Sequence, residues 1–196
     1  QLVMGLSSFY FDGCSNTWGA ELENPEVSRY SRLVCDHFGV DEHNIAQRGK
    51  SDKRVLRNLL ETDLSPYDCV IVQLTCKNRT EYWNERKNTW KTVRNPAKRN
   101  YWEALDDSKQ FWHYYWKNFY TDKLGDINQL TYYHAIRNIL KDKKHLIIGI
   151  AGWGQTVRAP VDINFTEYST AFRGHPDENA QKEIAETIIK YIESKY

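Results

Sequence analysis

Four short polar segments of this sequence carry side chains that could together perform acyl transfer. They contain Ser15, Gly49, Asn78 and His175; the first three follow strand-like stretches and the last precedes a helix-like one. A serine hydroxyl can attack a carbonyl carbon, and a histidine can take up the serine proton. Glycine N–H groups and an asparagine amide can hold the oxyanion that forms. The set predicts a serine-dependent reaction of an ester that needs neither a metal ion nor an organic cofactor.

Each of these four residues also has a purely structural interpretation. Ser15 could cap the helix that follows it, and Gly49 could only supply a positive φ angle. Asn78 could be an ordinary turn residue, and His175 could simply mark the start of a helix. The chemical interpretation therefore depends on the four segments meeting in space.

The elements that would position these segments alternate between strand-like and helix-like sequence. Short apolar runs predict strands at residues 8–12, 43–46, 67–75 and 145–151. Apolar residues at helical spacing predict helices at 26–38, 53–60, 103–120, 126–140 and 179–192. This order favours the α/β class, a three-layer α/β/α sandwich with a central, mostly parallel sheet. Ligands of such sheets bind beyond the carboxyl ends of the strands, where the polar segments lie.

Residues 79–125 interrupt this alternation, and we expect them to form a helical insertion that is both aromatic and basic. Its aromatic face consists of Phe111, Trp112, Tyr115, Trp116, Phe119 and Tyr120. Such a face more often belongs to the core or to a contact between subunits than to a lid over a substrate. A homo-oligomer that forms through this face is therefore a possible assembly. The basic run from Arg86 to Arg99 is expected to be solvated surface, with phosphate binding or nucleic-acid binding as the less expected alternative. A nucleic-acid partner is therefore not expected.

Length and composition narrow the class of protein further. With 196 residues, of which 40% are hydrophobic, the chain is expected to be a single domain, 1–196, with its own core. A net charge of +1 gives no global attraction to nucleic acid or acidic membranes. The apolar run 146–151 is too short to span a bilayer, and no signal peptide is visible, although the first residue is Gln1.

The cysteines indicate the cellular environment of the protein. The four of them, Cys14, Cys35, Cys69 and Cys76, contain no CxxC pair, which argues against a zinc site and a disulfide scaffold. We therefore expect a reduced, cytoplasmic protein. Cys14 and Cys76 are expected to be small buried hydrophobes, with a redox pair or a thiol nucleophile as the alternatives.

In their order along the chain, the four polar segments resemble the sequence blocks of the SGNH (GDSL-type) hydrolases. The resemblance covers about residues 8 to 192, with Ser15 in the first block, Gly49 in the second, Asn78 in the third and His175 in the fifth. It implies a flavodoxin-like strand order and a serine esterase or acyltransferase acting on a small acyl ester, with carbohydrate esters as one substrate class. It also implies that Ser15 is the nucleophile and His175 the general base. The oxyanion hole would then consist of the Ser15 and Gly49 amides and the Asn78 side chain.

Two positions depart from the pattern of this family. Cys14 replaces the Asp of Gly-Asp-Ser. The resulting GCSxTxG motif resembles that of a variant subgroup of small bacterial and phage proteins. Phe172 stands three positions before His175, where the family has an acidic residue that orients the imidazole. Glu167, Asp162 or a backbone carbonyl could replace that residue. The alternative is a catalytically weakened fold that binds a glycan, nucleic acid or protein through the insertion.

Overall fold

Five parallel strands form the central sheet of this computed structural model, which describes residues 8–94, 107–150 and 157–196. In spatial order the strands are β2 (Asp41–Asn44), β1 (Ser8–Asp12), β3 (Cys69–Leu74), β6 (His145–Ile150) and β7 (Ile163–Phe165). Every neighbouring pair is parallel. The predicted α/β fold and its flavodoxin-like strand order are confirmed.

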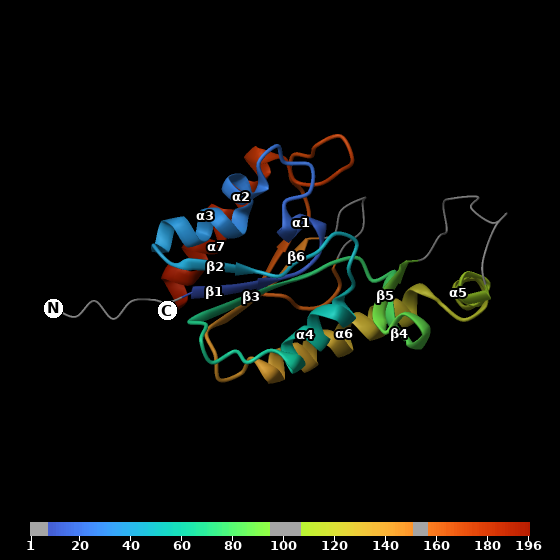
Figure 1. Cartoon of the computed structure of the whole chain (residues 1–196). Helices are drawn as coiled ribbons and strands as arrows, with labels where there is room; N and C mark the ends of the chain where they lie inside the picture. Colours follow the sequence, from blue (N-terminus) through green and yellow to red (C-terminus); the bar gives the residue numbers. More distant parts are fainter. Residues whose placement is uncertain (1–7, 95–106, 151–156) are drawn as a thin grey trace.

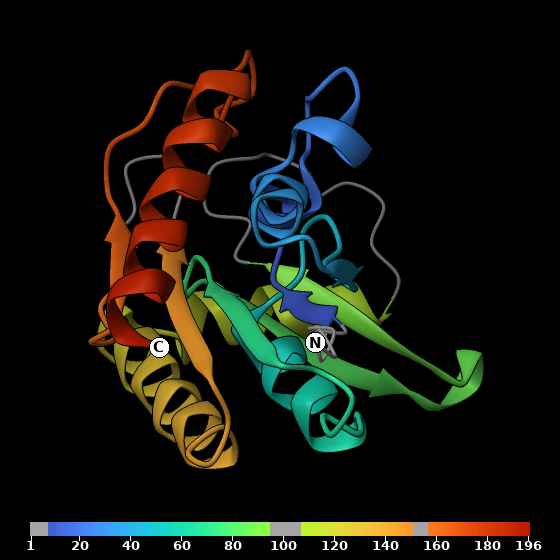
Figure 2. The ribbon, with the colours of Figure 1, turned by 90° about the vertical axis from the view of Figure 1, so that its left-hand side faces the viewer.

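Helices cover both faces of this sheet, as Figure 1 shows. One face carries α3 (Tyr30–Phe38) and α7 (Glu178–Lys195), and the other carries α4 (Asp52–Glu61) and α6 (Asp122–Ile139). In the view of Figure 2 the sheet lies between these two layers. Because β3 and β6 are covered on both faces, all of their residues are buried and their sequences are nearly continuous apolar runs.

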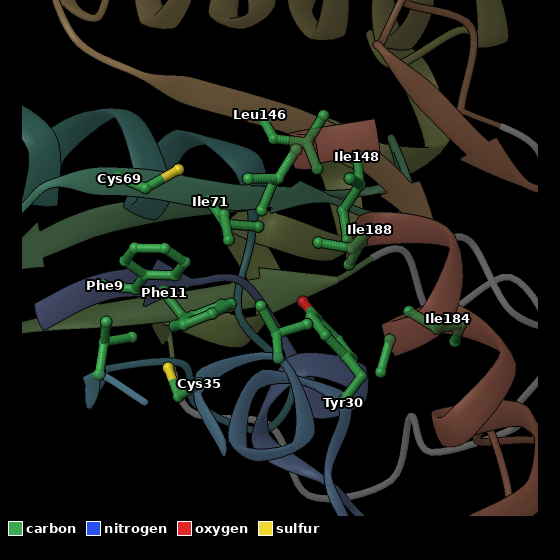
Figure 3. Close-up of a cluster of buried hydrophobic side chains, with 14 of the residues drawn as sticks. Phe9, Phe11, Tyr30, Cys35, Cys69, Ile71, Leu146, Ile148, Ile184 and Ile188 are labelled. Carbon is green, nitrogen blue, oxygen red and sulfur yellow. The ribbon is translucent and has the colours of Figure 1, made fainter. Parts of the chain in front are cut away.

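Two apolar clusters, one on each face of the sheet, hold the three layers together. Phe11 and Ile71 point to one face and belong to the same apolar cluster as Ile184 of α7 (Figure 3). Val70, the neighbour of Ile71, points to the other face and packs with Ile136 of α6. This alternation follows from the two-residue period of a strand. Burial of these side chains supplies the main driving force for the sandwich.

The helix predicted over residues 26–38 is divided into two helices. α2 (Pro25–Ser28) is separated from α3 by Arg29, whose backbone is extended with φ −70° and ψ 145°. The Arg29 guanidinium lies 2.7 Å from Glu42 of β2. This ion pair connects the break to the edge of the sheet, a contact that apolar spacing does not reveal.

The prediction of a helical insertion is wrong for residues 79–94. They form an antiparallel hairpin of β4 (Arg79–Asn84) and β5 (Thr89–Arg94), joined by a 3₁₀ turn (Glu85–Lys87) and Asn88. Trp83 and Trp90 face each other across the hairpin with ring centroids 5.5 Å apart. Such cross-strand aromatic pairs favour a hairpin over a helix. Lys98 and Arg99 of the basic run lie outside the described residues.

The aromatic face of the insertion lies on α5 (Asp107–Asn118) and the residues that follow it, and it is only partly buried. Trp116 is 6% exposed, and Trp112 packs on Tyr82 of the hairpin at 5.2 Å. Phe111 and Phe119 are each 60% exposed. A homo-oligomer through this face stays a prediction. None of the helices in the described parts of the chain has the length and apolarity to cross a membrane.

The other predicted elements are present with shifted ends. The strand expected at 43–46 is β2 and begins two residues earlier, and the helix at 126–140 is α6 and begins at Asp122. The N-cap of α4 is Ser51, whose hydroxyl accepts a hydrogen bond from Arg54 N. The short strand β7 was not predicted, because three residues, of which the middle one is exposed, are too few to show a clear period.

Candidate active site

Ser15 begins α1 (Ser15–Trp18), a four-residue helix directly beyond the carboxyl end of β1. The turn into this helix requires Gly13, because a Cβ there would lie 2.5 Å from Thr17 Oγ1 and 2.8 Å from Gln73 Oε1. The Ser15 side chain is nearly buried and its hydroxyl donates to Cys14 Sγ at 3.8 Å. The serine is thus presented on a sharp strand-to-helix turn at the edge of the sheet.

The Gln73 side chain of β3 holds this turn in place. Its Oε1 accepts hydrogen bonds from Cys14 N at 3.1 Å and from Thr17 Oγ1 at 2.8 Å. Its Nε2 donates to Ile150 O at 2.9 Å, which connects the turn to β6. Gln73 was not among the predicted site residues. The available signal was one amide within the otherwise apolar stretch of β3.

Three contacts bring the four polar segments to the same edge of the sheet. Gln47 N, in the segment of Gly49, donates to Gly13 O at 3.5 Å. Cys14 Sγ lies 3.3 Å from Thr75 Oγ1, in the segment of Asn78. On the other side, Gln181 Nε2 of α7, the helix that follows His175, donates to Asn16 O at 3.4 Å. The spatial meeting on which the chemical interpretation depends therefore occurs at the level of the segments.

Gly49 and Asn78 both lie in turns next to Ser15's strand. Gly49 has φ 72°, a left-handed conformation that glycine adopts without strain. Asn78 is half-buried in the turn before β4. Within the described residues, no hydrogen bond involves its side-chain amide.

His175 has an acidic partner that the sequence did not indicate. Its Nδ1 lies 2.6 Å from Glu21 Oε2, and both side chains are about one-fifth exposed. The same carboxylate accepts hydrogen bonds from Arg173 N at 2.8 Å and His175 N at 3.4 Å. Glu21 lies six residues after Ser15, in the turn that follows α1, so one short segment carries both the serine and the acid.

The hydrogen bonds to Glu21 keep this carboxylate ionised. Burial alone would raise the pKa of Glu21, but the bonds from the His175 ring and from the backbone N–H groups of Arg173 and His175 outweigh it and lower the pKa. The expected substitutes do not take this position. Asp162 binds Arg137 at 2.9 Å instead, and Glu167 is exposed.

The two members of the predicted catalytic pair are not in direct contact in this structure. Within the described part of the chain, no hydrogen bond joins Ser15 to His175. Since Nδ1 of His175 is bound to Glu21, its Nε2 is the ring nitrogen that remains for another partner. Catalytic hydrogen bonds are often long in unliganded enzymes and shorten when substrate binds.

All four cysteines are buried and free. Cys14 is 1% exposed and Cys76 5% exposed, as expected for small buried residues. Burial raises the pKa of the Cys76 thiol, which disfavours a reactive thiolate there. Among the described residues, no three His, Cys, Asp or Glu side chains gather in a way that could hold a metal ion.

Solved structures with a similar overall fold include esterases and a lipase. A carbohydrate esterase whose active site is described as having divergent catalytic and non-catalytic binding functions aligns with a TM-score of 0.54 and 12% identity, over 100% of this chain and 67% of its own. The psychrotrophic esterase EstA from a Pseudoalteromonas species aligns with a TM-score of 0.52 and 12% identity, over 95% of this chain and 97% of its own. A lipase from a goat rumen metagenome aligns with a TM-score of 0.51 and 15% identity, over 96% of this chain and 97% of its own.

At these identities the similarity shows the fold alone. No protein-family model matches the sequence, and no curated protein matches it. TM-scores of 0.54 and 0.51 nevertheless show that this chain and these hydrolases share a similar overall fold. The chain therefore has a three-layer α/β/α fold similar to that of these esterases and this lipase.

Proposed function

We propose that this protein hydrolyses or transfers a small acyl ester through Ser15, His175 and Glu21. The observation that carries the proposal is the 2.6 Å contact between His175 Nδ1 and Glu21 Oε2, a residue in the turn directly after the helix that Ser15 begins. A carboxylate at Nδ1 fixes the tautomer that leaves Nε2 free to accept a proton, and it stabilises the imidazolium that forms. Glu21 thereby takes the role of the acid that is absent at Phe172.

The reaction follows from these roles. Ser15 Oγ forms a bond to the carbonyl carbon of the ester while its proton passes to His175 Nε2. The negative charge that develops on the carbonyl oxygen is held by the N–H groups of Ser15 and Gly49 and by the Asn78 amide. When the C–O bond to the alcohol breaks, His175 returns the proton to the leaving alcohol. Water, or a second alcohol, then repeats the sequence and releases the acyl group.

The substrate that we favour is an acetyl or other short acyl group on a polar molecule such as a carbohydrate. Carbohydrate esterases are among the proteins with this fold, which supports that class. Ser15 follows Cys14, whose N–H donates to Gln73, and its side chain is nearly buried, so a small acyl group makes the least demand on space there.

A fluorophosphonate probe tests the proposal together with 4-nitrophenyl acetate. We expect the probe to label the wild-type protein and Cys14→Ala, and labelling and turnover to disappear in Ser15→Ala. Activity that survives Ser15→Ala and is blocked by iodoacetamide would assign the nucleophile to Cys14 instead. If the wild-type protein shows neither labelling nor turnover, the fold serves as a binding module and the proposed reaction is wrong.

A further inference from the structure

A cluster of cations surrounds the turn that holds Gly49. We call it the basic rim, and it consists of Arg48, Lys50, Arg79 and Arg94. Arg79 Nη1 donates to Lys50 O at 3.1 Å, so the start of the β4–β5 hairpin lies against this turn. Arg94 Nη2 lies 3.7 Å from the position that a Cβ on Gly49 would occupy. Two guanidinium groups of the hairpin therefore border the proposed oxyanion hole.

The basic rim also reaches the helix of Ser15. The Arg48 guanidinium stacks on the Trp18 ring at 4.2 Å from its centroid, and Trp18 is the last residue of α1. Figure 1 shows α1 and the hairpin at the same end of the sheet. The basic rim thus contacts both the Gly49 turn and the last residue of the helix that Ser15 begins.

The charges of the basic rim repel one another. Arg79 and Arg94 are directly opposite in the register of the hairpin, an arrangement that destabilises an antiparallel pair when the charges are alike. Burial, together with nearby cations such as Arg54 and Lys91, lowers the pKa of Lys50. A fold that keeps these charges together leaves a site of positive potential that a bound anion would stabilise.

The nearby carboxylates are already engaged elsewhere. Asp12 binds Arg54 at 2.7 Å, and Glu81 binds Arg57 at 2.8 Å. Over residues 8–94, 107–150 and 157–196, no ion pair joins a carboxylate to any member of the basic rim. Among these residues, the positive charge of the basic rim is thus not neutralised by a direct ion pair. Because the net charge of the chain is only +1, this potential is a local feature of the site.

We propose that the ester processed at Ser15 carries a carboxylate or phosphate group, which the basic rim binds. Guanidinium groups bind both anions through paired, charge-assisted hydrogen bonds, and bound anion would relieve the repulsion between Arg79 and Arg94. This inference rests on the proposed function, since it assigns the substrate class of the same site. It predicts a preference for anionic esters over neutral ones of equal size.

Three acetate esters of para-substituted phenols test this preference. They are 4-acetoxybenzoate, its neutral methyl ester and 4-acetoxyphenyl phosphate. The value of kcat/KM is measured by acetate release and divided by the rate constant of each ester with hydroxide, which removes differences in intrinsic reactivity. We expect the normalised value to be higher for at least one anionic ester than for the methyl ester. The ratio between the carboxylate and phosphate esters shows which anion the basic rim prefers.

Variants of the hairpin assign the preference to the basic rim. Because one charge-assisted contact is lost, Arg94→Gln should lower kcat/KM about 5- to 30-fold for the preferred anionic ester and less than about twofold for the methyl ester. Lys87→Gln is the matched control, since it removes the same charge from the exposed tip of the same hairpin. It should leave the preference unchanged.

The outcomes separate this inference from the proposed function. Turnover that depends on Ser15 but shows no anionic preference overturns the inference and leaves the proposed function intact. An equal loss for all three esters in Arg94→Gln also overturns it, because Arg94 would then support the fold or the oxyanion rather than a substrate anion. If no ester is turned over and no probe labels Ser15, both proposals are wrong. Binding of a DNA oligonucleotide that is lost in Arg94→Gln, without an ester preference, would assign the basic rim to nucleic acid instead.

Discussion

At the scale of single residues, the site depends on one carboxylate that holds one imidazole. Glu21 has φ 71°, an uncommon conformation for a residue with a side chain, and it accepts three hydrogen bonds from the His175 segment. These bonds offset the strain of the backbone. The conformation of Glu21 is thus stabilised by its contacts with the His175 segment and not by the helix next to it in the sequence.

We expect Glu21→Gln to lower kcat about 10²- to 10⁴-fold, because an amide NH₂ group facing Nδ1 favours the wrong tautomer of His175. The change keeps the size of the side chain, so folding should be little affected. Steady-state kinetics with 4-nitrophenyl acetate measure the effect. Glu23→Gln is the control, since Glu23 is exposed on the same loop, and it should retain wild-type kcat. Equal activity of the two variants would remove Glu21 from the proposed mechanism.

At the scale of elements, a buried ion pair joins the end of β1 to α4. Asp12 is fully buried and accepts hydrogen bonds of 2.7 Å from Arg54 Nη1, Asn58 Nδ2 and Gly13 N. Arg54 and Asn58 lie four residues apart and therefore on one face of α4. The turn that presents Ser15 begins at Gly13, so this contact fixes the start of the site.

Asp12→Ala should lower the free energy of unfolding by about 3–5 kcal/mol, because it leaves the Arg54 charge buried without a partner. Urea denaturation followed by tryptophan fluorescence measures the loss. The matched control is Asp36→Ala, which removes the exposed partner of Arg32 on α3 and should cost less than about 1 kcal/mol. Similar losses in the two variants would show that the buried pair contributes no more than a surface pair.

At the scale of the whole molecule, Asp52 connects one helical layer to the sheet. It begins α4 and accepts hydrogen bonds from Thr75 N beyond β3 at 2.7 Å and from Gln129 Nε2 of α6 at 2.9 Å. Gln129 Oε1 in turn accepts from Arg158 N at 2.8 Å. Burial raises the pKa of Asp52 to about 7, against the opposing effect of these hydrogen bonds and of Arg79.

This shift predicts how the stability of the fold depends on pH. The unfolded chain loses the Asp52 proton near its ordinary pKa of 3.8, whereas the folded chain keeps it until about pH 7. Folding therefore takes up a proton between these values, and the free energy of unfolding falls by up to a few kcal/mol as the pH rises through this window. Urea denaturation of the wild-type protein and Asp52→Asn across this range measures the effect. The stability of the wild type relative to the variant should decline with pH, and a constant or rising difference would contradict the shift.

The sequence by itself determined the layers of this protein and the segments of its candidate site. Apolar runs and helical spacing are local properties, so they predicted β1, β3, β6, α4 and α7. The rule that parallel sheets bind ligands beyond their strand ends then selected the segments of Ser15, Gly49 and Asn78. Spacing failed where a local rule was overridden, as in the hairpin over residues 79–94, whose aromatic pair forms only across strands.

Only the tertiary structure decided which groups meet within the site. Glu21 and His175 are 154 positions apart, and Gln73 lies 59 positions from Cys14. Neither pair has a spacing that a helix or a strand would impose. Their contact depends on how α7 and β3 pack around α1, and the same packing sets Arg79 and Arg94 beside Gly49. Short-range periodicity is a property of neighbouring residues and can be seen in the sequence. Long-range contacts form only when the sheet and its two helical layers pack together.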